Sequence, residues 1–112
     1  MKPGSIQRIG SDRVYAVGGA VYTADVALIP QGGRLLGWSV LESSGSAAVK
    51  VALYDGHDAN GQVLDLMEVS TGASKIVAFW AGGIDVQGGV FIHLISGQAQ
   101  VVVWYRYDMG PA

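Results

Sequence analysis

The chain has 112 residues, of which 50% are hydrophobic and 14% are charged, and its formal net charge is −2. This length suits one domain and not two, and the sparse charge argues against the basic surface that nucleic-acid binding requires. The absence of cysteine excludes disulfides and thiolate metal sites, and no run approaches the roughly 18 apolar residues of a membrane span. We therefore expect one domain with no nucleic-acid or membrane partner.

The N-terminal residues Met1-Lys2-Pro3-Gly4 are not followed by the apolar core of a secretory signal. We interpret residues 1–12 as an extended N-terminal arm, residues 13–108 as a single β domain and residues 109–112 as a frayed tail. The simplest inference is a protein that is made and kept in the cytoplasm, or assembled there before release.

Seventeen glycines and three prolines separate short runs that are rich in Val, Ile, Leu, Trp and Tyr. This spacing is typical of an antiparallel β-sandwich or barrel, and no segment has the periodicity of a helix. We predict about eight strands. They are Arg13–Val17, Ala20–Leu28, Arg34–Glu42, Ala47–Tyr54, Val63–Val69, Ser74–Phe79, Gly89–Ile95 and Ala99–Tyr107.

The alternation of side chains predicts which residues share a face of each strand. In the third predicted strand these are Leu36, Trp38 and Val40, and in the fourth Val49, Val51 and Leu53. The last two predicted strands are apolar on both faces, with Val101, Val103 and Tyr105 opposed by Val102, Trp104 and Arg106. Strands of this kind are buried on both faces, so we expect a loop or another chain to cover the outer one.

The glycine-rich connections predict turns. Gly18-Gly19 and Gln31-Gly32-Gly33 have the composition of hairpin turns, and Ser43–Ser46 that of a short polar turn. The segment Ile84-Asp85-Val86, between two glycine pairs, is either a brief edge strand or a bulge.

Catalytic chemistry has little support. His57 lies in a polar loop and His93 in an apolar strand, and neither has a second histidine nearby. Asp55, Asp58 and Asn60 offer the oxygen ligands of a weak cation site, but their spacing does not match a calcium loop and a plain turn selects the same residues. No nucleophile elbow is present. We therefore expect neither an enzyme nor a bound metal or cofactor.

The aromatic residues are the main candidates for a contact surface, because Trp and Tyr are enriched at interfaces. They fit core or subunit-interface anchors better than a sugar-stacking platform. The interface candidates are Trp38, Tyr54, Phe91, Trp104, Tyr105 and Tyr107.

A set of strand and turn residues gives the chain a family resemblance. It comprises Arg34-Leu35-Leu36-Gly37-Trp38-Ser39-Val40, Ala52-Leu53-Tyr54-Asp55-Gly56, Gly61-x-x-Leu64, Gly83-Ile84-Asp85-Val86, Gly88-Gly89-Val90-Phe91-Ile92 and Ser96-Gly97. With these residues the chain resembles small β-sandwich structural proteins of tailed bacteriophages, over residues 34 to about 105. The resemblance implies a jelly-roll-like sandwich that is trimeric or otherwise oligomeric and is attached to a capsid or tail in many copies.

Together these features predict a non-enzymatic virion protein, foremost a capsid decoration or cementing subunit that binds the major capsid protein or another virion protein. The apolar surplus of so small a domain supports contact with partners. The alternative is a carbohydrate- or receptor-binding module that uses the same aromatic residues. A small enzyme of the cupin or hydrolase kind is the weakest hypothesis.

Overall fold

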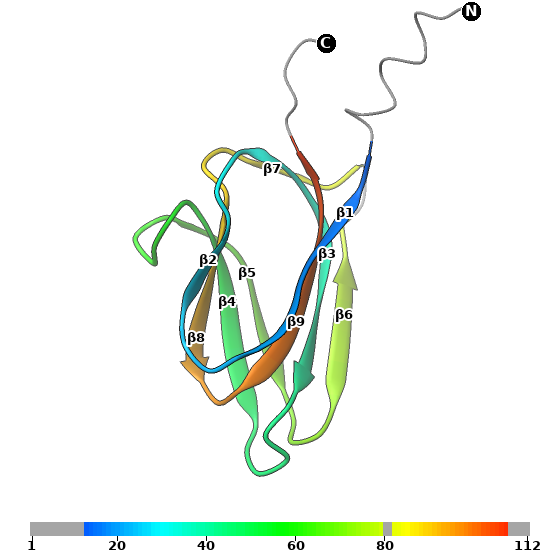
Figure 1. Cartoon of the computed structure of the whole chain (residues 1–112), viewed down its shortest axis with the longest axis vertical. Helices are drawn as coiled ribbons and strands as arrows, with labels where there is room; N and C mark the ends of the chain where they lie inside the picture. The colour runs from blue at the N-terminus through cyan, green and yellow to red at the C-terminus, as the bar shows by residue number, and fades with distance from the viewer. Residues whose placement is uncertain (1–12, 80–81, 108–112) are drawn as a thin grey trace, which may run out of the picture.

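The computed structural model describes residues 13–79 and 82–107. The strands of these residues are β1 (Tyr15–Tyr22), β2 (Val26–Ile29), β3 (Gly33–Glu42), β4 (Val49–Asp55), β5 (Gln62–Val69), β6 (Ser74–Ala78), β7 (Ile84–Val86), β8 (Val90–Ser96) and β9 (Ala99–Tyr107). They form two sheets packed face to face (Figure 1). The predicted arm and tail, and Asp108 of the predicted domain, lie outside the described residues. The described part contains no helix long and apolar enough to cross a membrane.

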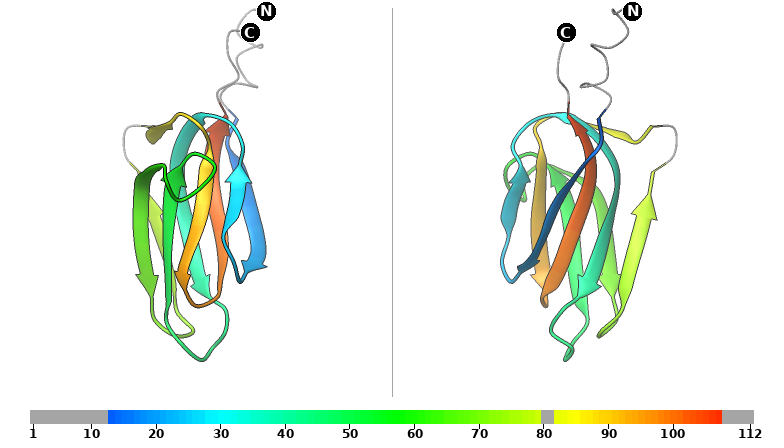
Figure 2. Two further views of the ribbon diagram at one scale, coloured as in Figure 1. Left: turned by 90° about the vertical axis from the view of Figure 1, so that its left-hand side faces the viewer. Right: turned by 45° about the vertical axis from the view of Figure 1, so that its right-hand side comes forward.

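The two sheets have the strand order of a jelly roll. Sheet A has the order β1-β9-β3-β6, with β7 beside the other end of β3, and sheet B has the order β2-β8-β4-β5. All the strand pairs are antiparallel. With β7 set aside, the eight remaining strands cross between the sheets as two Greek keys do. The predicted jelly-roll-like antiparallel sandwich is therefore confirmed (Figure 2).

The core lies between the sheets and is made by alternate residues of the central strands. Val49, Val51 and Leu53 of β4 are fully buried, as their alternation predicts. Val101, Val103 and Tyr105 of β9 are buried against them from sheet A. Each such aliphatic side chain stabilises the fold by about 1.5–3 kcal/mol through loss of apolar surface to water.

A bulge in β3 changes the prediction for its faces. The register against β9 shifts between Leu35 and Gly37, so Leu36 and Gly37 together lie opposite Trp104. Leu35 is fully buried, whereas Leu36 is only half-buried. The prediction that Leu36 shares the inward face with Trp38 is therefore wrong, because the extra residue reverses the alternation.

The glycines of the first strands also differ from the prediction. Gly18 and Gly19 lie inside β1, where the register against β9 shifts between Gly18 and Val21, so they form a bulge and not a turn. Gly18 has φ 109°, and a Cβ at this position would collide with the backbone carbonyl of Val101. The chain reverses at residues 23–25 instead, which divides the predicted strand Ala20–Leu28.

Two other connections involve β3. The segment Gln31-Gly32-Gly33 leads from β2 in sheet B to β3 in sheet A, so it crosses between the sheets and is not a hairpin. Ile84-Asp85-Val86 forms the short strand β7, which pairs with Gly33–Leu35 of β3. The edge-strand interpretation of this segment is confirmed.

Candidate docking face

The outer face of sheet A has three rows of four residues that point away from the core. The rows follow from the register of the four strands β1, β9, β3 and β6, which lie side by side in Figure 2. They are Val21–Gln100–Leu41–Ser74, then Gly18–Val102–Ser39–Ile76, then Ala16–Trp104–Gly37–Ala78. We call these twelve residues the uncharged face, because none of them is ionisable.

The uncharged face exposes large aliphatic side chains. The exposed fraction is 50% for Val21, 40% for Leu41 and 72% for Ile76. Val102 lies in the same row as Ile76 and Trp104 in the next row, and both are half-buried. Exposed apolar residues that are scattered singly need no explanation, but a contiguous apolar sheet face is a feature of interaction sites.

Small residues keep the uncharged face flat around its one tryptophan. Trp104 has Ala16 and Gly37 as its cross-strand neighbours, and Gly37 in turn lies opposite Ala78. The side chain of Gln100, the longest polar group of the face, donates a hydrogen bond to the carbonyl of Gly19 at 2.7 Å. Its polar atoms are thus partly satisfied within the chain, which lowers the desolvation cost of covering the face.

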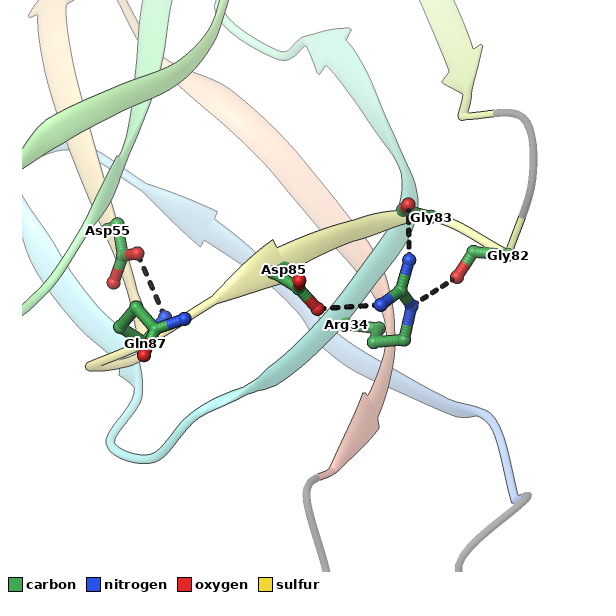
Figure 3. Close-up of polar contacts among 6 residues, drawn as sticks. All are labelled: Arg34, Asp55, Gly82, Gly83, Asp85 and Gln87. Carbon is green, nitrogen blue, oxygen red and sulfur yellow. Dashed lines mark hydrogen bonds and ion pairs between the residues drawn. The ribbon is translucent and has the colours of Figure 1, made fainter.

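Two arginines mark one end of the uncharged face. Arg34 of β3 and Arg106 of β9 are cross-strand partners, one row beyond Trp104. The guanidinium of Arg34 donates to the Asp85 carboxylate at 2.6 Å and to the carbonyls of Gly82 and Gly83, each at 2.8 Å (Figure 3). Arg34 therefore holds the segment before β7 against β3.

The outer face of sheet B is different, because it includes charged residues. Lys50 and Glu68 are cross-strand partners in β4 and β5. His93 of β8 lies 2.9 Å from the Asp25 carboxylate, which also accepts a hydrogen bond from the amide of Leu94. These bonds, chiefly the one with His93, hold the pKa of Asp25 below its usual value.

The predicted interface residues lie in four different places. Trp38 and Tyr105 are fully buried in the core, so neither is available to a partner of the folded domain. Trp104 lies on the uncharged face, and Tyr54 and Phe91 are half-buried cross-strand partners on the outer face of sheet B. The last candidate, Tyr107, lies at the end of β9, with its ring 5.2 Å from that of Tyr15.

Tyr107 also lines a shallow hollow at this end of the sandwich. The hollow has a volume of about 460 Å³, and its other lining residues are Tyr15, Pro30 and Gln31. The hydroxyl of Tyr105, beneath it, donates to the carbonyl of Gln31 at 3.0 Å. Among the described residues, those that line it include no ionisable group other than the two tyrosines.

The oxygen atoms of the Asp55–Gly61 loop are engaged in holding the backbone. The Asp55 carboxylate accepts hydrogen bonds from the amides of Gln87 at 2.9 Å and Gly88 at 2.8 Å, and Figure 3 shows the first of these. Asp58 Oδ1 accepts from the amide of Asn60 at 2.9 Å, as in an ordinary Asx turn. Within residues 13–79 and 82–107, no three His, Cys, Asp or Glu side chains are grouped to hold a metal ion. This geometry favours the turn over the cation site.

The free edges of the sheets are less suited to docking than the uncharged face. A bulge interrupts β1, and another interrupts the four-residue strand β2. In β6, Lys75 is paired with the inward-facing Val40, so a charge points inward at this edge. Bulges, short strands and inward charges all hinder the addition of a further strand.

The sequence indicated part of this face. Apolar residues on both sides of Ala99–Tyr107 predicted that something covers its outer side, and Val102 and Trp104 lie there. Val21, Leu41 and Ile76 were missed, because their contribution depends on the register of β1, β3 and β6 around β9. Comparisons with protein-family models, curated proteins and solved structures found no match to this chain.

Proposed function

We propose that this protein is a non-enzymatic structural subunit of a virion, foremost a capsid decoration or cementing protein that is present in many copies. The observation that carries the proposal is the uncharged face, which we assign to the seam between subunits. The resemblance of residues 34 to about 105 to phage structural proteins supplies the class of assembly. The partners in this proposal are the major capsid protein, or another virion protein, and further copies of the chain itself.

Physical chemistry supports a seam at this place. Exposed Val21, Leu41 and Ile76 favour burial, at about 25 cal/mol per Å² of apolar surface removed from water. The other residues of the uncharged face carry no charge, so docking there removes no charged group of this face from water. A subunit that binds only the assembled shell stabilises that shell by mass action, which is the action of a cementing protein.

The test is the copy number of this chain in purified virus particles from its source, measured by quantitative mass spectrometry. We expect a copy number comparable to that of the major capsid protein. We also expect particles that lack the chain to open at a lower temperature, and to regain their stability when the purified protein is added. Absence of the chain from the particles would overturn the proposal.

A matched pair of variants connects the copy number to the uncharged face. Val21 and Val63 are both valines on edge strands, exposed by 50% and 52%, but Val21 lies on the uncharged face and Val63 on the outer face of sheet B. We expect Val21→Glu to lower the number of copies on the particle and Val63→Glu to leave it unchanged. Equal occupancy for the two variants would remove the uncharged face from the proposal.

Carbohydrate binding is the second candidate, favoured by the pairing of Tyr54 and Phe91 on the outer face of sheet B. The ring of His93 lies 5.9 Å from that of Tyr54 but at 61° to it, so these rings do not form one flat platform. A glycan array tests this function. Binding that Tyr54→Ala abolishes would favour it, and the absence of binding to any glycan would eliminate it.

A further inference from the structure

We infer that the uncharged face of sheet A packs against the same face of a second copy of the chain, across a two-fold axis. This inference rests on the proposed function, because it names the partner of the proposed seam. It concerns residues 13–79 and 82–107, whose strand register defines the face.

Charge complementarity selects the second copy as the partner. A partner that placed Lys, Arg, Asp or Glu over the three rows would bury that charge with no counter-charge. Docking against the outer face of sheet B would remove Lys50, Glu68 and Asp25 from water, whereas the uncharged face offers them no opposite charge. The uncharged face brings no ionisable residue over itself, so pairing of like faces avoids this penalty.

The arginines decide the orientation of the two copies. Arg34 and Arg106 lie together at one end of the face. Of these two arginines, only Arg34 has an ion-pair partner among the described residues, which is Asp85. Parallel copies would bring the two arginine pairs together, whereas antiparallel copies place them at opposite ends. The two-fold axis therefore lies between the faces and across the strands, near the middle row of Val102 and Ser39.

The size of the face predicts a weak, reversible dimer. Four strands about 4.8 Å apart and three rows about 7 Å apart cover roughly 400 Å² in each copy. Two copies would bury roughly 800 Å², which is below the roughly 1,000 Å² of a stable specific interface. We therefore expect dimers that dissociate on dilution, and that are favoured where many copies are held together on a shell.

The first experiment is sedimentation equilibrium of the full chain over a wide concentration range. We expect a monomer–dimer equilibrium. Ile76→Glu, on the uncharged face, should weaken it by about tenfold or more, since the new carboxylate would be buried against an uncharged surface. Leu66→Glu is the matched control, because Leu66 is an exposed aliphatic residue of the edge strand β5 on the other sheet. It should leave the equilibrium unchanged.

The second experiment uses the absence of cysteine from the chain. A single Val102→Cys variant has its one thiol near the proposed axis, and packed sheets lie about 10 Å apart. A bifunctional thiol reagent of that span should therefore link two copies. Val63→Cys, on the outer face of sheet B, should give only the background level of linked product.

The outcomes separate this inference from the proposed function. A monomer at every concentration, a trimer, or equal effects of Ile76→Glu and Leu66→Glu would overturn the two-fold seam. A chain that is monomeric in solution yet abundant on particles would overturn the seam and leave the virion function standing. If the chain forms this dimer in solution but is absent from the particles, the two-fold seam is supported and the proposed virion function is overturned.

Discussion

The indole of Trp38 and the carboxylate of Asp65 join the two sheets of the sandwich. Trp38 Nε1, on β3 of sheet A, donates a hydrogen bond to Asp65 Oδ2, on β5 of sheet B, at 2.8 Å. Trp38 is fully buried, and its N–H is a donor that needs an acceptor. Asp65 supplies this acceptor from the edge strand β5. Its charge also hinders the addition of a further strand at that edge.

Removal of this acceptor should destabilise the domain. Asp65→Ala leaves the indole N–H of Trp38 without its partner, and a buried unsatisfied donor costs about 1–3 kcal/mol. Asp65 is half-exposed, so water reaches the vacated position and the loss falls toward the lower value. Urea unfolding followed by tryptophan fluorescence measures it. Asp65→Asn keeps a carbonyl oxygen and should recover much of the stability, and an unchanged unfolding midpoint for Asp65→Ala would contradict the argument.

Glu42 should make the stability depend on pH at acidic values. Its side chain is 2% exposed, and its carboxylate accepts hydrogen bonds from the amide and hydroxyl of Ser44 and from the amides of Gly45 and Gly72. These donors, with the Ser44 side chain first, lower the pKa of Glu42 from 4.5 to about 2. They also join the β3–β4 turn to the turn before β6.

The sign of the effect follows from the lowered pKa. Because the folded state holds the proton more weakly than the unfolded state, the stabilisation is complete above pH 4.5 and is lost as the pH falls toward 2. Glu42→Gln should lower the midpoint of thermal unfolding at neutral pH and flatten its decline between these pH values. If the stability of Glu42→Gln falls between pH 4.5 and 2 as steeply as that of the original chain, Glu42 contributes nothing to the pH dependence of stability.

Arg34 should act on one segment and little on the whole fold. Lysine has a single charged group and cannot reproduce the three bonds that the guanidinium makes to Asp85, Gly82 and Gly83. Arg34→Lys should therefore speed amide hydrogen exchange in residues 82–86. Global stability should fall by no more than about 1 kcal/mol, because the ion pair is partly exposed. Uniform loss of protection over the sandwich would contradict a local role.

Asp55 should fix the start of β8 relative to β4. Its carboxylate oxygens accept from the amides of Gln87 and Gly88, and an asparagine in its place has only one oxygen to offer. Asp55→Asn should raise the exchange rates of these two amides by different amounts. Asp58→Asn is the control, since Asp58 accepts only from the Asn60 amide in its own loop. If the amides of Gln87 and Gly88 exchange at the same rates in Asp55→Asn and in Asp58→Asn, the contact made by Asp55 does not stabilise this segment.

The sequence by itself determined the class of the fold. The period of two in Val49, Val51 and Leu53, and in Val101, Val103 and Tyr105, is a local property, because successive side chains of any strand point to opposite faces. Glycine spacing likewise predicted six of the strands near their observed positions. The first and second strands were misjudged because the same Gly-Gly pair suits either a turn or a bulge, and pairing with β9 decides between them.

Only the tertiary structure decided the partners of the polar groups and the composition of the uncharged face. Trp38 and Trp104 have similar apolar neighbours in sequence, yet one is in the core and the other on the surface, since Trp38 pairs with the inward-facing Val103 and Trp104 lies on the opposite face of β9. Asp65 lies 27 residues from Trp38, and Asp25 lies 68 residues from His93. Alternation along a strand is read from neighbouring residues, whereas these contacts depend on which strands pair and in what register, and that is settled by the packing of the whole chain.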